Sequence, residues 1–182
     1  LPEVLDTQLA AIAEAARRTG CSPSVMAPMV STPREAAAFA ARARAAGIGR
    51  VGVMVEVPAA ALLAAEILAE VDFLSIGTND LGQYTFAADR QHPGLADLLD
   101  PAQPALLRLV ELCATAGRTV GKPVGVCGEA AGDARLAPVL VGLGVTSLSM
   151  SAVSIPAVRE ALAAHTLEAC RSQASRRLLV SR

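Results

Sequence analysis

Short apolar runs alternate with longer stretches rich in alanine and leucine along this chain, and this alternation restricts the fold more than any other feature. Such a pattern is typical of parallel βα units, in which each strand is followed by a helix that packs on the sheet. Five strands are predicted, at Ser24 to Val30, Arg50 to Val57, Asp72 to Gly77, Pro123 to Cys127 and Ser147 to Ser151. The predicted fold class is therefore α/β.

Proline and glycine mark the ends of the helical stretches. The stretch from Pro33 to Ala46 follows Ser31 and Thr32, which are candidate caps, has proline in its first turn and stops at Gly47. The other predicted helices are Pro58 to about Glu70, Pro104 to Ala116 with its end at Gly117, Asp133 to Leu143, Ser154 to Ala164, Pro2 to Arg18 and Leu167 to Val180. Each is expected to cover the sheet.

Chain length favours an incomplete barrel. A closed (βα)8 barrel of the TIM type has eight strands and typically about 250 residues, whereas this chain has 182 residues. We therefore predict a single domain over residues 1–182 that holds the last five of eight βα units and is truncated at its N-terminus. The alternative is an open doubly wound sheet, but the sequence has no GxGxxG turn to mark a dinucleotide site.

Composition narrows the class of partner. With 53% apolar residues and a net charge of −1, the chain can bury a core and has no basic surface for nucleic acid. Four aromatic residues, Phe39, Phe73, Tyr84 and Phe86, are too few for a platform that stacks bases. A small-molecule ligand is therefore expected, with no nucleic acid.

Neither a membrane segment nor a disulfide framework is expected. Acidic residues interrupt the richest apolar stretch, so no run reaches the roughly 18 residues that a membrane-spanning helix needs. The four cysteines show neither a CxxC pair nor Cys/His ligand spacing, and we interpret them as reduced thiols of a cytoplasmic protein.

Polar side chains follow the predicted strands at the point where each strand ends. Glu56 closes the second strand, Asn79 and Asp80 follow the third, and Cys127 and Glu129 follow the fourth. In β/α barrels the carboxyl ends of the strands converge on one face, where active sites form. Since Mg²⁺ is generally held by one or two carboxylates together with substrate oxygens, Glu56 and Asp80 are candidate ligands. The alternative is that both acids cap the helices that follow them.

Five segments carry a more specific signal, and in chain order they are VMAPMVSTPREA, VGVMVEVPAA, FLSIGTNDLGQYTFAADR, GKPVGVCGEAAGD and SLSMSAVSIP. In these segments the sequence resembles the C-terminal domain of Enzyme I of the bacterial sugar phosphotransferase system. The resemblance covers nearly the whole chain. Pyruvate phosphate dikinase and phosphoenolpyruvate synthase share the strand-end acid and GTND, but QYTFAADR and SMSAVSIP are closer to Enzyme I.

The resemblance implies a ligand set. It implies that Glu56 and Asp80 bind Mg²⁺ and that Asn79, Asp80 and Arg90 contact phosphoenolpyruvate. A planar guanidinium suits this role because it can donate two hydrogen bonds to a phosphate. We expect Arg90 to lie just beyond a loop opened by Gly77 and Gly82, the latter standing where the family usually has threonine.

Cys127 is implied to be the proton donor that converts enolpyruvate to pyruvate. A thiol is mostly protonated at neutral pH and can therefore act as an acid. The alternative for Cys127 is a buried, inert strand cysteine, and the alternative for Arg90 is a surface ion pair with Asp89.

The resemblance also implies partners. The phosphoryl group is expected to pass to a histidine on a separate N-terminal domain of the parent protein and then to the carrier protein HPr, for sugar uptake, in a homodimeric enzyme. We interpret His92 and His165 as surface residues that are not the acceptor. Two other classes stay open: a non-catalytic dimerisation or sensing module, and a metal-dependent aldolase or lyase on a similar barrel.

Overall fold

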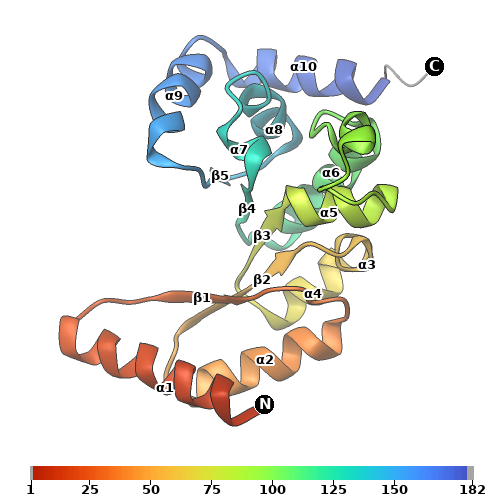
Figure 1. The fold of residues 1–182 in the computed structure, drawn as a ribbon. Helices are drawn as coiled ribbons and strands as arrows, with labels where there is room; N and C mark the ends of the chain where they lie inside the picture. Colours follow the sequence, from red (N-terminus) through yellow and green to blue (C-terminus); the bar gives the residue numbers. More distant parts are fainter. Residues whose placement is uncertain (1, 180–182) are drawn as a thin grey trace.

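The computed structural model describes residues 2–179 and contains one sheet of five parallel strands in the order β1-β2-β3-β4-β5 (Figure 1). The strands are β1 (Ser24–Ala27), β2 (Arg50–Val55), β3 (Phe73–Gly77), β4 (Val124–Cys127) and β5 (Ser147–Leu148). Consecutive parallel neighbours that follow the chain are the arrangement of adjacent units of a β/α barrel. The predictions of an α/β fold and of a partial barrel are thus confirmed.

All five strands lie within the ranges that the sequence predicts, each is shorter than predicted, and the two outer strands lose the most residues. β1 ends at Ala27 rather than Val30, because Met29 adopts a left-handed backbone with φ 55°, which an extended strand does not allow. β5 ends at Leu148 rather than Ser151 and pairs with β4 through only two residues.

Helices connect the strands and cover the sheet. They are α1 (Pro2–Thr19), α2 (Pro33–Ala45), α3 (Pro58–Leu62), α4 (Ala64–Glu70), α5 (Thr78–Phe86), α6 (Pro104–Val120), α7 (Glu129–Gly132), α8 (Ala137–Leu143), α9 (Ile155–Ala163) and α10 (Leu167–Leu179), with short 3-10 helices η1 (Pro93–Leu99) and η2 (Ala152–Ser154). Helix α10 lies against α8. The predicted last residue of α10, Val180, lies outside the described residues.

The cap of α2 follows the sequence prediction. The Thr32 side chain accepts from the backbone N–H of Glu35, and the Glu35 carboxylate accepts from the backbone N–H of Thr32, which together form a capping box. The carboxylate also accepts from the N–H of Ser31, and these bonds hold the pKa of Glu35 below its ordinary value.

Three helix predictions need correction. The stretch from Pro58 to Glu70 is two helices that meet at Leu63, and the helix predicted from Asp133 begins only at Ala137. The third correction concerns Gly117, which does not end α6. That helix continues to Val120 and ends at Gly121, which adopts a left-handed backbone with φ 69°.

The core lies between the sheet and the helices α2, α4, α6 and α8. Several side chains of β2 and β3 are fully buried, among them Val53, Val55 and Ile76 at 0% exposure. Helix α2 contacts α4, α4 contacts α6, and α6 contacts α8, so the four helices form one continuous layer on the sheet (Figure 1). This layer packs on one face of the sheet. The carboxyl ends of the strands are not covered by it and are surrounded by the segments that follow each strand.

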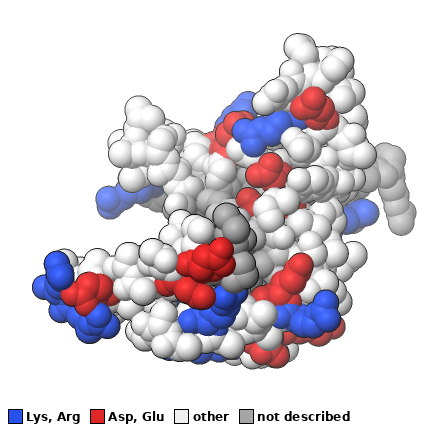
Figure 2. All heavy atoms as spheres, turned by 60° about the horizontal axis from the view of Figure 1, so that its bottom comes forward, with Lys and Arg blue, Asp and Glu red and all other residues white. Residues whose placement is uncertain are grey.

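Charged side chains of both signs are interspersed on the face of the molecule that Figure 2 shows, with no large area of a single sign. The distribution agrees with the net charge of −1 and gives no support for a nucleic-acid surface. Across residues 2–179, none of the helices combines the length and the apolar character that crossing a membrane requires.

Substitution by alanine at two glycines inside helices is expected to change the free energy of unfolding in opposite directions. A Cβ at Gly117 would lie 2.5 Å from Val124 Cγ2 and 2.7 Å from the Lys122 carbonyl oxygen, whereas a Cβ at Gly82 would meet only Leu106 at 3.8 Å. Gly117→Ala should lower the free energy of unfolding by about 1–3 kcal/mol through overpacking. Gly82→Ala should raise it by about 0.4–1 kcal/mol by restricting the unfolded chain.

Urea unfolding followed by circular dichroism measures both changes. If Gly117→Ala proved as stable as the unsubstituted chain, the close packing of α6 on β4 would be wrong.

Candidate functional site

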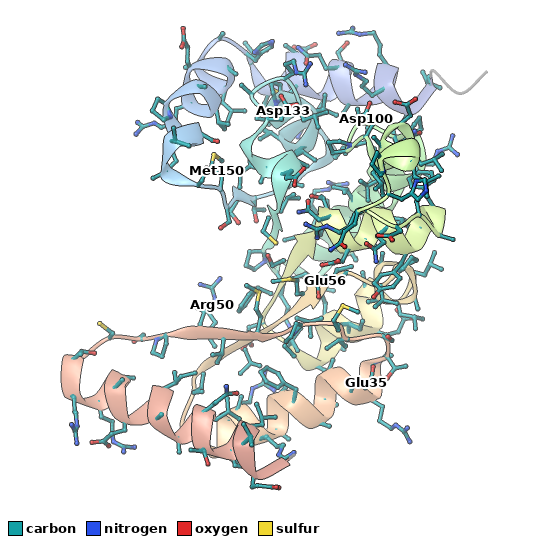
Figure 3. All side chains as sticks on the ribbon, in the orientation of Figure 1. Glu35, Arg50, Glu56, Asp100, Asp133 and Met150 are labelled. Atoms are coloured by element: carbon teal, nitrogen blue, oxygen red, sulfur yellow. The ribbon has the colours of Figure 1, made fainter. Side chains whose placement is uncertain are left out.

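The site begins with a buried acid at the end of β2. Glu56 is 7% exposed, and its Oε2 accepts a hydrogen bond from the backbone N–H of Met29 at 2.8 Å. Its side chain lies against the end of β3, since a Cβ at Gly77 would be 2.8 Å from Glu56 Cγ. Gly77 therefore leaves room for Glu56. Figure 3 labels Glu56 near the end of β2.

Glu56 does not cap α3. The residue at the cap position is Val57, and no side chain bonds to the free backbone N–H groups of that helix. The capping alternative is therefore wrong for Glu56, and another reason is needed for a carboxylate held at this depth.

Asp80, near the start of α5, forms an ion pair with Arg90, which follows the end of this helix. Asp80 lies in the first turn of α5, whose cap position is Gly77 without a side-chain cap, so Asp80 is not the cap either. Arg90 Nη1 lies 3.7 Å from Asp80 Oδ1, and both side chains are partly exposed, at 46% and 38%. A pair this exposed contributes little to stability and leaves both groups accessible to a ligand.

One alternative and one expectation about this segment are wrong. Arg90 pairs with Asp80 and not with Asp89, whose Oδ1 accepts from the backbone N–H of Gln91. The segment that contains Gly82 is a helix, not a loop opened by two glycines. Helix α5 therefore determines where Arg90 lies relative to the end of β3. The residue at the C-cap of α5, Ala87, adopts a left-handed backbone with φ 48°.

Cys127 is the last residue of β4, and Asn79 lies in the first turn of α5, which directly follows β3. The Cys127 thiol donates to the backbone carbonyl of Ile76, with Sγ and the oxygen 3.3 Å apart. Asn79 Oδ1 accepts from the backbone N–H of Glu129 at 3.1 Å. Cys127 is partly exposed, so the alternative of a fully buried, inert cysteine does not describe it.

Two cavities meet at this edge of the sheet and share Asn79 and Glu129. The larger, of about 640 Å³, is lined by Asn79, Cys127, Gly128, Glu129, Gly132, Asp133, Ser149, Met150, Ser151 and Ser154. The smaller, of about 320 Å³, is lined by Thr78, Asn79, Arg90, Ala96, Leu99, Pro101 and Glu129. Figure 3 labels Asp133 and Met150, which line the larger cavity from the segments that follow α7 and β5.

The cavities sort the predicted site residues. Asn79 shares the larger cavity with Cys127 and the smaller one with Arg90, and Asp80 joins them through its ion pair with Arg90. Glu56 lines neither cavity and is connected to the group through its packing against Gly77. Three predicted residues therefore line two cavities that share Asn79 and Glu129, Asp80 is paired with one of the three, and Glu56 lies buried beside the end of β3.

Sequence reasoning missed several lining residues. Asp133 was assigned to a helix, whereas it follows α7 and faces the larger cavity. Met150 and Ser154 lie in the SLSMSAVSIP segment, but no role was inferred for either, and only their position after β5 could have indicated one. Thr78 had a signal, because it is the second residue of GTND, but the resemblance implies roles only for its neighbours Asn79 and Asp80.

The donor set of the site suits Mg²⁺ only in combination with a substrate. Among residues 2–179, no group of three or more His, Cys, Asp and Glu side chains is placed to hold a metal ion. Mg²⁺, however, keeps several waters and commonly takes one or two carboxylates plus substrate phosphate oxygens. Glu56 and Asp80 offer hard oxygen donors on neighbouring strand ends, so the residues fit such an ion.

Two pKa values have clear physical causes. Hydrogen bonds from Arg135 lower the pKa of Asp133 and keep this carboxylate charged at the larger cavity. Burial raises the pKa of Cys113 from its ordinary value of 9.0 to about 12. Because the folded value is the higher one, the resulting stabilisation is fully present below about pH 9 and is lost as the pH rises toward 12.

The two histidines lie outside both cavities. His92 is exposed, and its Nδ1 accepts from the backbone N–H of Gly94 at 3.2 Å. His165 is only partly exposed, and its Nδ1 lies 2.7 Å from the carbonyl oxygen of Ala161. Neither side chain lines a cavity with the predicted site residues.

Known proteins match this chain over most of its length. Residues 1–167 match the family described as PEP-utilising enzyme, PEP-binding domain. A phosphoenolpyruvate-protein phosphotransferase of Streptomyces coelicolor is 57% identical over 96% of the chain, and those of Haloferax volcanii and Bacillus subtilis are 43% and 42% identical over 88% and 84%. The chain spans 32%, 31% and 29% of these relatives, or about a third of their length.

Solved structures resemble the chain in fold. A citrate lyase of Burkholderia xenovorans matches with a TM-score of 0.55 and 21% identity, covering 86% of this chain and 53% of that protein. A HpcH/HpaI aldolase/citrate lyase family protein of Burkholderia cenocepacia matches with a TM-score of 0.51 and 23% identity, covering 77% and 63%. At this identity the likeness concerns the fold alone.

Cysteine accessibility tests the position of Cys127. In the folded protein at about pH 8, iodoacetamide should label Cys21 and Cys127, which are accessible, since only accessible thiolates react. Cys113 and Cys170 should stay unlabelled until denaturant is added, because both are buried. Peptide mass spectrometry identifies the labelled residues. Protection of Cys127 equal to that of Cys113 would contradict its placement at the cavity.

Proposed function

The chain belongs to the PEP-binding domain family of the PEP-utilising enzymes, and on that premise we propose that it is the phosphoenolpyruvate-binding part of a phosphoenolpyruvate-protein phosphotransferase. One observation carries the proposal: Asn79 lines both the cavity that Cys127 lines and the cavity that Arg90 lines. Asn79 thus shares one cavity with a cation suited to a phosphate and the other with an acid suited to a carbanion. The names of the similar proteins favour this activity over a dikinase or a synthase.

In this proposal the phosphate and carboxylate of the ligand bind beside the start of α5. Arg90 donates to the phosphate in place of its weak contact with Asp80, and the Asn79 amide orients the ligand. Glu56 and Asp80 would hold Mg²⁺, which neutralises phosphate charge when it is bound. The depth of Glu56 supports this role, because a buried carboxylate gains from a neighbouring cation.

Two bonds are exchanged during the reaction. First, the bond between phosphorus and the oxygen on C2 breaks while phosphorus bonds to a histidine nitrogen, which leaves the enolate of pyruvate. The Cys127 S–H bond then breaks, and its proton is bonded to C3 by the electron pair of the C2–C3 double bond. The C2 oxygen becomes a ketone, and the thiolate regains a proton from water.

The acceptor histidine belongs, in this proposal, to a separate N-terminal domain of the parent protein. The positions of His92 and His165 outside both cavities support an acceptor from elsewhere. The domain would pass the phosphoryl group to HPr for sugar uptake in the cytoplasm. The unpaired edges of β1 and β5 among the described residues support association with further strands or with a second subunit in a homodimer.

Exchange of the pyruvate methyl protons with deuterium tests the proposed function. The longest natural chain that contains this sequence should catalyse the exchange in the presence of Mg²⁺, because the thiolate left after the thiol protonates C3 can remove a proton from C3 in the reverse direction. Cys127→Ala should slow it by about 10²–10⁴-fold. Cys21→Ala, which removes an accessible cysteine far along the chain, is the matched control and should exchange normally. Proton NMR follows the methyl signal, and full activity of Cys127→Ala would contradict the acid assignment.

A second prediction concerns the metal. Glu56→Gln keeps the shape of the side chain but removes its charge, so the Mg²⁺ concentration for half-maximal exchange should rise at least about tenfold, as for other changes at metal sites. The control is Glu66→Gln, on the exposed face of α4. An unchanged Mg²⁺ dependence in Glu56→Gln would remove Glu56 from the proposed site.

A further inference from the structure

Contacts between β3 and β4 continue beyond the last paired residues of the ladder. The register ends with Gly77 opposite Cys127. One residue after Gly77, the Thr78 hydroxyl donates to the Cys127 carbonyl oxygen at 3.1 Å. One residue before Gly77, the Ile76 carbonyl accepts from the Cys127 thiol. Both the backbone and the side chain of Cys127 are therefore attached to the end of β3.

Helix structure does not explain the Thr78 side chain. Thr78 is 4% exposed, and it and Glu56 are the two buried polar or charged residues among those the structure describes. Its hydroxyl does not cap α5, because the cap position is Gly77 and α5 has no side-chain cap bond. A buried hydroxyl needs a hydrogen-bond partner, and here that partner is the carbonyl of the candidate acid.

The peptide after Cys127 is confined as well. Gly128 has φ 86° and ψ −167°, and a Cβ at this position would lie 2.8 Å from Thr78 Oγ1 and 2.9 Å from Asn79 Oδ1. Two adjacent side chains of α5 therefore fill the space next to Gly128. Asn79 also binds the backbone N–H of Glu129, so bonds from α5 hold the backbone on both sides of Gly128.

We propose that Thr78 is a positioning residue for the Cys127 thiol, and that it links the segment that binds the ligand to the group that transfers the proton. This inference rests on the proposed function. Thr78 directly precedes Asn79 and Asp80 in α5, so the helix turn that contacts the phosphate also fixes the acid. Thr78 acts through the Cys127 backbone and does not itself touch the reacting carbon.

This arrangement predicts that loss of the Thr78 hydroxyl lowers the rate of proton transfer and leaves ligand affinity unchanged. Removing the hydroxyl frees the Cys127 carbonyl, so the thiol no longer points at C3 in one fixed orientation. Proton transfer requires the two heavy atoms within hydrogen-bond reach. Asn79, Asp80 and Arg90 keep their own contacts, and ligand affinity is therefore retained.

The test uses Thr78→Val, which has the shape of threonine without the hydroxyl, and Thr78→Ser, which keeps the hydroxyl. In the longest natural chain that contains this sequence, Thr78→Val should slow methyl exchange at saturating pyruvate by about 10–100-fold, the range for a small displacement of a reacting group, with KM changed less than about twofold. Thr78→Ser should restore most of the rate. Exchange by Thr78→Val at the unsubstituted rate, or a change confined to KM, would overturn the inference.

Thr146→Val is the matched control. The Thr146 hydroxyl also bonds to β4, but at its opposite end, where it donates to the Val124 carbonyl and accepts from the Val124 N–H. Its loss should lower stability without slowing exchange per folded molecule. An equal loss of rate in Thr146→Val and Thr78→Val would show a general structural effect and overturn the positioning role.

Alkylation of Cys127 tests the positioning role of Thr78 without requiring catalytic turnover. Thr78→Val should raise the rate at which iodoacetamide labels Cys127, because the thiol is released from its fixed orientation, while labelling of Cys21 stays unchanged. Equal Cys127 rates in both proteins would overturn the inference. Absence of exchange in the unsubstituted protein would contradict the proposed function, and the labelling rates would still report on Thr78.

Discussion

The parallel register of β2, β3 and β4 is the constraint on which the site depends. Val55 pairs with Ile76, and Gly77 pairs with Cys127, so the three strands end at the same edge of the sheet. A shift of one residue would turn alternate side chains to the other face. Glycines make this edge compact, because Gly77 leaves space for the Glu56 side chain and Gly128 leaves space for two side chains of α5. Close backbone contact is thus what brings the polar groups together.

Much of this arrangement could be predicted from the sequence. Strand positions followed from apolar runs bounded by turns, and the residues at strand ends followed from the direction that parallel strands share. Local signals failed where tertiary contacts decide. Gly117 reads as a helix end, yet it is the point at which α6 approaches Val124, and the helix over GTND was hidden by the glycines on either side of Asp80. The role of Thr78 required coordinates, because its partner lies 49 residues away in the chain.

Fold and chemistry separate clearly in this protein. The similar solved structures are a citrate lyase and an aldolase/citrate lyase family protein, which share the architecture at 21% and 23% identity. A β/α barrel presents strand-end side chains for many reactions, and the fold alone therefore selects none of them. The chemistry of this chain has to be argued from the groups at the edge of its sheet: a buried acid, an acid paired with an arginine, and a thiol that lines a cavity together with an amide. These groups suit a phosphorylated enol, which needs charge neutralisation at one end and a proton at the other.

We propose that one divalent ion joins Glu56 and Asp80 to a phosphorylated ligand. The most direct measurement is a crystal structure of the longest natural chain that contains this sequence, grown with Mn²⁺ and a non-reactive analogue of phosphoenolpyruvate, with anomalous scattering used to locate the metal. We predict a single Mn²⁺ peak that contacts a carboxylate oxygen of each acid and a phosphate oxygen at about 2.0–2.2 Å, close to the distances of Mg²⁺. An ion bound elsewhere, or an analogue bound without contact between the ion and Glu56, would contradict the account.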